Sequence, residues 1–329
     1  MKIIFLKKFL QFFLSIFILS FIVFYMSRLA PGEPLKSYYG EAVERMSIEQ
    51  QQVATEKLGL NKPIYQQYGI WIKDALKGDF GISYKYKDDV ISVIGDVFIN
   101  TIILGVSAYI LTFILCTLLG IFCALNEGNI FDRIVCMVGN IINSIPTFWV
   151  ALVLILIFSI NLNVLPSSGA YKIGQEESVV SRIEHLILPL IVMVLGHVWY
   201  YAYMIRNKLL EEIREDYVLL AKIKGCSNRV IVYKHCLKNI MPALITIMAI
   251  SIPHILGGTF VVEKIFSYPG MGSLTFESAK YHDYNMLMVL CLITGVVIII
   301  SNIVAEMINN KIDPRTKQVR GEYFEFTKK

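Results

Sequence analysis

The 329-residue sequence has little charge. Asp, Glu, Lys and Arg make up 17% of its residues, whereas 55% are hydrophobic. Ordinary soluble domains carry nearer a quarter of charged residues, so this composition excludes that class. The apolar stretches do not alternate with polar residues in short period-two segments, which argues against a transmembrane β-barrel. We therefore expect an all-α protein that crosses a lipid bilayer several times.

Motifs for several kinds of chemistry are also missing. The sequence contains no G-x-x-x-x-G-K-[ST] loop for ATP phosphates, no G-x-S-x-G elbow and no H-E-x-x-H helix. Its six cysteines form no C-x-x-C pair, and none falls in a segment expected outside the cell, so neither a zinc site nor disulfides are expected. We predict no catalytic residue, no metal site and no cofactor.

Ionisable residues inside the apolar stretches are few. His197 and His254 lie within stretches, and Glu306 lies close to the end of the last one. One histidine per span is more often a hydrogen-bonded packing residue than a proton relay. The sequence therefore gives little support to a carrier driven by protons or sodium, and the energy for any transport must come from another protein.

Six apolar stretches are present, each long enough to cross the hydrocarbon core as a helix. They are Phe9–Met26, Thr101–Leu125, Val135–Ile160, Leu186–Ile205, Ala243–Val262 and Met286–Ile308. The first is too long for a secretory signal and lacks a clean cleavage site, so we expect an uncleaved span. Basic residues precede the first stretch, separate the fourth from the fifth and follow the sixth, which predicts that both termini are cytoplasmic. The net charge of +5 reflects this topology and gives no reason to invoke nucleic acid as a partner; membrane lipid is the expected surrounding.

The chain divides into four parts on this reading. We expect a first transmembrane helix, an extracytoplasmic capping segment of two or three short helices, a core and a cytoplasmic tail, at residues 1–27, 28–98, 99–312 and 313–329. The core contains a cytoplasmic loop at about residues 206–240.

The third and fifth stretches contain the candidate residues of a transport pathway. The third is interrupted at Asn143-Ser144-Ile145-Pro146, which predicts either a kinked helix lining a cavity or a hairpin of two short helices. We assign Asn143 and Pro146 to the pathway on this ground. The fifth stretch adds Ser251, His254, Gly257 and Gly258, although close helix packing explains its glycines equally well.

The segment Glu215–Asn228 predicts a helix that ends at a glycine, followed by the start of a second helix. Tyr217, Ala221 and Gly225 are spaced to share one helix face, which ends in small residues that let another surface approach. Gly225 permits a sharp change of direction, and Ser227 can cap the next helix through its hydroxyl. The pattern is typical of a docking surface or of an amphipathic loop helix that closes a bundle.

Several different short motifs are distributed along nearly the whole chain. They are Leu58-Gly59-Leu60-Asn61-Lys62-Pro63, Gly78-Asp79-Phe80-Gly81, Ser144-Ile145-Pro146-Thr147-Phe148-Trp149, Asp216-Tyr217-Val218 through Ala221 to Gly225, Phe266-Ser267-Tyr268-Pro269-Gly270-Met271-Gly272, His282-Asp283-Tyr284 and Asp313-Pro314-Arg315. Together they resemble the permease subunits of ABC importers of the oligopeptide, dipeptide and nickel branch. Asp216-Tyr217-Val218 stands where Glu-Ala-Ala would stand in the broader importer pattern, as in that branch.

The resemblance implies a type I ABC importer permease fold in a bacterial inner membrane. It implies a second homologous permease subunit, two cytoplasmic ATPase subunits that hydrolyse ATP and an extracytoplasmic substrate-binding protein as partners. The loop with Asp216, Tyr217, Ala221, Gly225 and Ser227 would then couple this chain to an ATPase.

The substrate stays open at this point. Peptides are one class, and a nickel ion or metal chelate is the other. Few histidines and no paired cysteines argue against direct metal ligation in the pore, but a chelate needs none. A membrane scaffold that recruits a cytoplasmic partner without transport is the third alternative.

Overall fold

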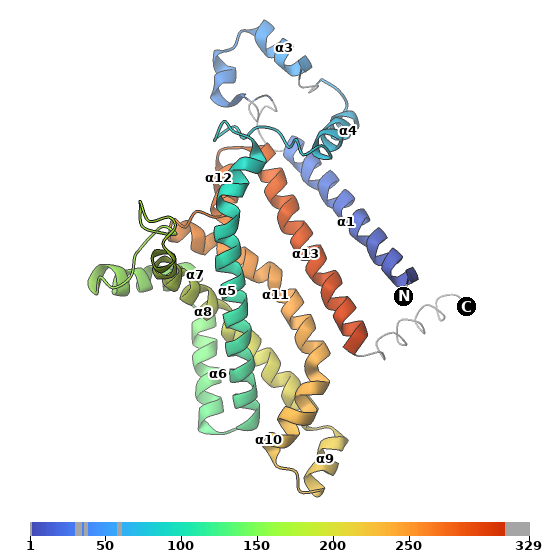
Figure 1. Ribbon diagram of the computed structural model, residues 1–329, viewed down its shortest axis with the longest axis vertical. Coiled ribbons are helices and arrows are strands. Elements are labelled where there is room, and N and C mark those ends of the chain that lie inside the picture. Colours follow the sequence, from blue (N-terminus) through green and yellow to red (C-terminus); the bar gives the residue numbers. More distant parts are fainter. Residues whose placement is uncertain (1, 30–34, 36–38, 58–60, 313–329) are drawn as a thin grey trace. The chain divides into compact units, whose positions relative to one another are not determined.

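The computed structural model describes residues 2–29, 35, 39–57 and 61–312. These residues are built from helices joined by short connections (Figure 1), and they contain one isolated β bridge, between Ile82 and Asp89. The predicted all-α class is confirmed. The predicted tail at 313–329, with its Asp313-Pro314-Arg315 motif, lies outside the described residues, as do Leu58-Gly59-Leu60.

The helices keep the order of the sequence stretches. They are α1 (Lys2–Leu29), η1 (Gly40–Arg45), α3 (Ile48–Lys57), α4 (Ile64–Ala75), α5 (Val90–Leu125), α6 (Ile130–Asn143), α7 (Thr147–Leu154), the π-helical η2 (Ile155–Asn161), α8 (Val179–Ile213), α9 (Asp216–Ile223), α10 (Asn228–Ile231), the π-helical η3 (Val232–Cys236), α11 (Leu237–Ile265), α12 (Met271–Lys280) and α13 (Tyr284–Ile312). Among the described residues, five helices are long and apolar enough to cross a membrane, or six when α6 with α7 and η2 is taken as one bent span. The six predicted stretches correspond to these spans.

The chain forms two compact units. The first contains residues 1–102 and 267–300, and the second contains residues 103–266 and the end of the chain from Ser301. Helices α5 and α13 each contribute to both. The candidate site residues named above all belong to the second unit.

In the first unit, α5 begins earlier than the apolar stretch predicts. Asp89 caps the helix, because its Oδ2 accepts hydrogen bonds from the backbone N–H groups of Ile91 and Ser92 at 3.0 and 3.2 Å. The first turns then bury Val90, Val93 and Ile94 against α12 and α13. The predicted capping segment, which extends to residue 98, therefore ends in the first turns of α5, which are amphipathic rather than uniformly apolar.

The rest of the first unit contains the segment predicted to cap the outer mouth. Its described residues form three short helices, η1, α3 and α4, in agreement with the two or three expected. Tyr68 of α4 is buried with Phe24 of α1, and its hydroxyl lies 2.8 Å from the Oγ of Ser20. The capping role itself stays a prediction.

In the second unit, α8 packs against α6, α7 and α11. The side chains of Tyr201, Ile205 and Leu209 on α8 are almost wholly buried. At Gly139 of α6, an added Cβ would lie 3.2 Å from the ring of Trp199. Helix α6 therefore reaches α8 at close range because this position has no side chain.

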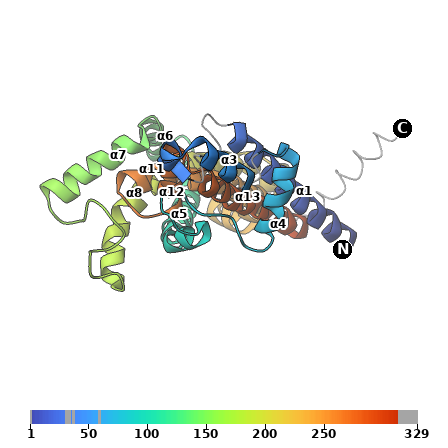
Figure 2. The same ribbon diagram turned by 90° about the horizontal axis from the view of Figure 1, so that it is seen from above.

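The third apolar stretch breaks between Asn143 and Thr147. The axes of the two halves differ by 95°, and Figure 2 shows α6 nearly end-on with α7 lengthwise beside it. Pro146 precedes α7 and has no N–H group to continue the ladder of α6. Ser144 closes α6 by donating from Oγ to the carbonyl of Asn140 at 2.8 Å. The angle of 95° between the two helix axes is larger than in a kinked helix and smaller than in a hairpin of two antiparallel helices.

Candidate functional site

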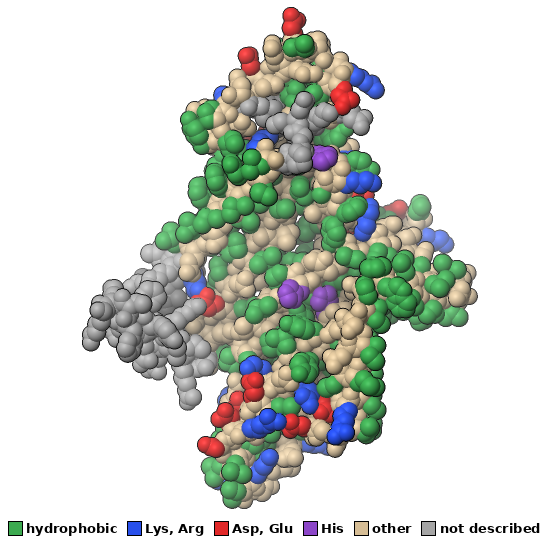
Figure 3. Space-filling view, turned by 180° about the vertical axis from the view of Figure 1, so that it is seen from behind, with side chains coloured by type: hydrophobic (Ala, Val, Ile, Leu, Met, Phe, Trp, Pro, Cys, Tyr) green, Lys and Arg blue, Asp and Glu red, His purple; other side chains and the backbone are tan. Residues whose placement is uncertain are grey.

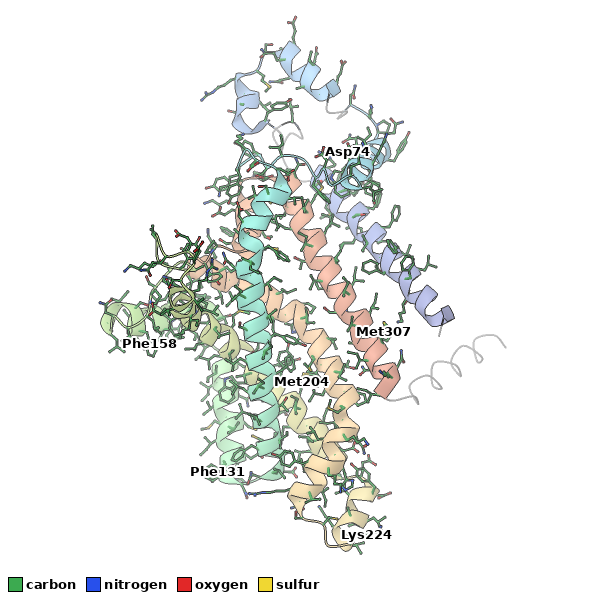
Figure 4. The ribbon with its side chains drawn as sticks, in the orientation of Figure 1. Asp74, Phe131, Phe158, Met204, Lys224 and Met307 are labelled. Atoms are coloured by element: carbon green, nitrogen blue, oxygen red, sulfur yellow. The ribbon has the colours of Figure 1, made fainter. Side chains whose placement is uncertain are left out.

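The connection between α8 and α11 contains the predicted helix–glycine–helix segment. Helix α9 ends at Ile223, a turn follows, and α10 begins at Asn228 and leads through η3 into α11. Figure 4 places Lys224 at this turn, at the end of the second unit. We call residues 214–239 the α8–α11 connection.

Gly225 stops α9 by adopting a left-handed conformation, with φ of +83°. Its N–H donates to the carbonyl of Lys222 at 2.9 Å, and the N–H of Cys226 donates to that of Ala221 at 3.1 Å. This pair of bonds is the Schellman termination, which favours glycine because other L-residues are strained there. An added Cβ would meet no atom within 4 Å, so the constraint from this chain is conformational and the surrounding space is open to a partner.

Ser227 caps α10 as its position in the sequence predicts. Its Oγ accepts a hydrogen bond from the N–H of Val230 at 3.5 Å, the arrangement expected at a helix N-cap. The turn and the cap therefore fix the direction in which α10 leaves α9. The structural parts predicted for Gly225 and Ser227 are confirmed, while their role toward a partner stays a prediction.

The two faces of α9 differ from the expectation. Val218 is fully buried, and Tyr217 and Ala221 are half-buried within the chain. Leu219, Leu220 and Ile223 point outward, with exposures of 60%, 53% and 75%. The apolar surface available to a partner is therefore on the opposite side from the face of Tyr217 and Ala221, although the Leu-Leu-x-x-Ile spacing was visible in the sequence. Asp216, at the first turn, is exposed.

Glu212, in the last turn of α8, holds this connection from inside. Its Oε1 accepts hydrogen bonds from the hydroxyl of Tyr217 at 2.7 Å and from Nδ2 of Asn239 at 2.9 Å. The Tyr217 hydroxyl also lies 3.6 Å from the Sγ of Cys236. Burial, followed by the bond to Glu212, raises the pKa of Tyr217, so its phenol remains a donor at neutral pH. Sequence reasoning missed Glu212.

Two arginines near the end of α8 form ion pairs with other segments of the chain. Arg206 donates from Nε and Nη2 to the two carboxylate oxygens of Asp132 on α6, at 2.7 and 2.6 Å, and Asp132 is 3% exposed. Arg214 donates to Glu127 in the loop before α6 at 2.8 Å, in an exposed pair. Figure 3 shows acidic and basic side chains gathered at the end of the second unit where α9 and α10 lie. Sequence reasoning used these arginines only for topology.

A cavity of about 290 Å³ lies between α6 and the middle of α8. It is lined by Cys123, Val135, Cys136, Gly139, Asn140, Asn143, Trp199, Tyr200, Ala202, Tyr203 and Arg206. A second hollow, of about 270 Å³, adjoins it at the α6–α7 break, where Asn143 and Pro146 meet Gly196 of α8. We call the two hollows the α6–α8 cleft. The structure thus brings the predicted Asn143 and Pro146 together and adds Asn140, Tyr200 and Tyr203.

The pathway residues predicted on α11 separate into two groups. His254 and Gly257 are exposed, and Nδ1 of His254 lies 3.2 Å from the hydroxyl of Tyr201. Gly258 lies beside α8, because an added Cβ would approach Cε1 of His197 at 3.0 Å. Ser251 is fully buried and donates to the carbonyl of Met248 at 2.7 Å. In this chain taken alone, Ser251 therefore has no exposed surface.

No metal centre is visible in the part of the chain that the structure describes. None of those residues forms a group of three or more His, Cys, Asp or Glu side chains arranged to hold an ion. His197 directs Nδ1 to the carbonyl of Met193 at 2.7 Å, which is the bond of a satisfied intrahelical histidine. The site consists of surfaces and a cleft rather than of reacting groups.

The sequence matches known families over most of its length. Residues 116–318 match the family described as "Binding-protein-dependent transport system inner membrane component", and residues 1–105 match its N-terminal membrane component. The oligopeptide transport system permease protein AppB of Bacillus subtilis is 33% identical over 303 residues, which cover 92% of this chain and 94% of that protein. The metal-staphylopine import system permease protein CntB of Staphylococcus aureus is 30% identical over 314 residues, covering 95% and 97%.

A solved structure resembles the chain at the level of fold. An inward-facing conformation of the MetNI methionine ABC transporter gives a TM-score of 0.54 at 15% identity, over 68% of this chain and 97% of that chain. At this identity the likeness concerns the arrangement of helices and not the ligand.

Proposed function

Because this chain belongs to the family of binding-protein-dependent transport system inner membrane components, we propose that it is the permease subunit of an ATP-driven importer of peptides. It is a multi-pass membrane protein with a type I ABC importer permease fold. The observation that carries the substrate class is the similarity, over nearly the whole chain, to a protein named as an oligopeptide permease. In this proposal the membrane is the bacterial inner membrane and both termini are cytoplasmic.

The partners follow from the same proposal. A second homologous permease completes the pore, two ATPase subunits bind from the cytoplasm and hydrolyse ATP, and a substrate-binding protein delivers peptide from outside. In the same proposal, the loop 263–272 and the part of the capping segment from Tyr65 to Phe80 face that binding protein. The lack of a phosphate-binding loop in this sequence supports placing ATP hydrolysis on other chains.

Helix α9 is the proposed contact with the ATPase. Leu219, Leu220 and Ile223 form an exposed apolar strip at the end of the second unit, with Lys222 and Lys224 exposed beside it. An apolar strip with a charged rim is the usual composition of a helix that docks in a groove. Gly225 keeps the end of α9 clear of side chains, so an opposing surface can come close there.

The α6–α8 cleft and the exposed side of α11 are the proposed transport pathway. Asn140 and Asn143 present carboxamides on exposed helix positions, and His254 and Gly257 present polar and small groups. Unsatisfied polar groups are costly against hydrocarbon, so these faces are better suited to a partner helix or to a water-filled path than to lipid. A carboxamide both donates and accepts, as a peptide bond does, which suits transfer of peptides of varied sequence.

The mechanism requires a stiff connection from ATPase to span. ATP binding would close the ATPase pair and displace α9, and the bundle would rock as a rigid body to open the cleft to the other side of the membrane. The bonds at the end of α8 make that displacement common to α6, α8 and α11. No residue of this chain undergoes chemistry in such a cycle.

Reconstitution tests the proposal. The chain would be co-expressed with a second permease, the ATPase subunits and a binding protein from the same organism, and the assembly would be placed in vesicles loaded with ATP. We expect labelled oligopeptide to accumulate with ATP and the binding protein, and not with a non-hydrolysable analogue. Docking of the ATPase without ATP-dependent uptake of any substrate would contradict the proposal and favour the scaffold alternative.

A metal chelate is the second candidate substrate. It is favoured by the similarity, over 95% of this chain, to a permease named for import of a metal–staphylopine complex. The same vesicles distinguish the two when they are offered peptide, nickel alone and a nickel chelate. Thermal stabilisation of the binding protein by one of these three gives an independent answer.

A further inference from the structure

One carboxylate oxygen joins three helical segments at the α8–α11 connection. Glu212 lies in the last turn of α8, Tyr217 in the first turn of α9, and Asn239 in the first turn of α11. Both donors reach the same Oε1, at 2.7 and 2.9 Å. The Glu212 side chain therefore contacts both α9, which follows α8, and the start of α11, to which the chain returns.

The backbone connection from α8 to α9 is shorter than the connection from α9 to α11. Only Arg214 and Glu215 separate α8 from α9, but α9 reaches α11 through a glycine turn, α10 and a π-helical turn. Each of those elements can absorb a displacement by a small change in backbone angles. The bonds through Glu212 bypass them, because they connect the start of α9 to the start of α11 across one side chain.

The kind of bond matters as well as its position. Buried apolar contacts, such as that of Val218, hold α9 to the chain but have no preferred direction, so they permit sliding. Hydrogen bonds to a carboxylate are directional and stronger than neutral ones. The bond from Tyr217 restricts the register and rotation of α9 against α8, and the bond from Asn239 ties the start of α11 to the same oxygen.

We propose that Glu212 is a positioning residue for coupling: through Tyr217 and Asn239 it makes α9 move together with α8 and α11. This inference rests on the proposed function, since it concerns motion that an ATPase imposes on α9. Without Glu212, α9 still docks, but its displacement is partly lost in the turns that lead to α11.

The test compares transport per ATP in reconstituted vesicles of the full assembly. Glu212→Gln keeps a carbonyl oxygen that accepts both hydrogen bonds, whereas Glu212→Leu keeps the size and removes the acceptor. We expect Gln to retain peptide transported per ATP within about twofold. We expect Leu to lower it about tenfold or more, because Leu accepts neither the bond from Tyr217 nor the bond from Asn239. Capture of the ATPase subunits by the two variants should be equal.

Smaller variants and a matched control complete the comparison. Tyr217→Phe removes one hydroxyl and should lower the same ratio several-fold, with little further loss when combined with Glu212→Leu. If Glu212→Leu does not insert, Tyr217→Phe gives the decisive measurement. The control is Glu211→Leu, because Glu211 is exposed and its partner is Lys208, outside this connection.

A distance measurement separates coupling from general damage. Spin labels at Lys222 and Lys238, both exposed, should give one narrow distance distribution in the parent chain and a broad one in Glu212→Leu. An unchanged transport ratio and an unchanged distribution in Glu212→Leu and Tyr217→Phe would overturn the inference. Absence of uptake in the parent vesicles would instead contradict the proposed function, before any variant is compared.

Discussion

The last turns of α8 and its middle are held by different kinds of contact. Near its end, Arg206 binds α6 and Glu212 binds the starts of α9 and α11. Arg214, the residue directly after α8, binds the loop before α6. In the middle, Tyr200 and Tyr203 border open space opposite the carboxamides of α6. One helix therefore combines an end bound by charged groups with a middle that borders a cavity, and Arg206 belongs to both because it also lines the cavity.

The difference separates two mechanical tasks. Directional bonds at fixed positions resist shear and transmit a displacement. Side chains that line a cavity lack packing partners on one side and are less constrained. If α9 is displaced, the bonds at the end of α8 transmit the displacement, and the cavity beside the middle of α8 changes shape. Variants that damage one region and spare the other test this division.

The largest effect is expected at Gly225. Gly225→Arg or Gly225→Glu should abolish ATP-dependent uptake and return ATP hydrolysis to its unstimulated rate, while leaving membrane insertion intact. The left-handed conformation costs an L-residue about 1–2 kcal/mol, and a charged side chain would fill the open space beside the turn. Gly225→Asn is the control, because Asn tolerates this conformation better and is small. Normal uptake by the Arg variant would remove α9 from the coupling role.

The buried pair at the fastened end should dominate stability. Asp132→Ala removes the carboxylate that accepts two hydrogen bonds from the guanidinium of Arg206, whose side chain is 16% exposed. We expect a loss of about 3–5 kcal/mol in unfolding free energy, as for other broken buried pairs, measured by thermal unfolding in detergent. Replacing both residues by Leu should recover most of the loss.

A matched exposed pair sharpens that measurement. Glu127→Ala breaks the bond to Arg214, where the two side chains are 44% and 69% exposed, and should cost no more than about 1 kcal/mol. Equal losses of unfolding free energy in Asp132→Ala and Glu127→Ala would mean that burial does not strengthen the Asp132–Arg206 ion pair relative to the exposed Glu127–Arg214 pair.

The exposed strip of α9 should affect uptake through docking. Ile223→Glu or Leu220→Glu places a charge on the apolar surface, and we expect about a tenfold weaker affinity for the ATPase subunit, since an apolar contact is replaced by a desolvated charge. Lys222→Glu, on an exposed position of the same helix, tests whether charge alone explains the loss. Titration of purified ATPase against the permease in nanodiscs gives the affinities, and unchanged binding of both apolar-to-Glu variants would shift the contact back to the face of Tyr217 and Ala221.

The sequence predicted the features that depend on local patterns. Apolar length located the spans, and the glycine after α9 and the serine before α10 located a turn and a cap that the structure confirms. The start of α5 was missed because Val90, Val93 and Ile94 form an amphipathic face outside the uniformly apolar stretch.

Long-range partners could not be read from the chain. Asp132 and Arg206 are separated by 74 positions, and their pairing depends on how α6 packs on α8. The inward face of α9 likewise follows from Glu212 and Asn239, which meet only once α8 and α11 lie side by side. Spacing along α9 predicts two faces but not which one the rest of the chain covers.

The smallest effect is expected in the open middle. Asn143→Leu, and Asn140→Leu separately, remove a carboxamide from the α6–α8 cleft at nearly constant volume, and each should lower peptide uptake about threefold to tenfold, as for one lost hydrogen bond. Basal ATPase activity and docking should not change, because these residues lie away from α9. Met137→Leu, on the same helix and exposed, is the control for altered packing. Uptake unchanged in both Asn variants would place the peptide elsewhere, and the open middle of α8 would then serve helix packing alone.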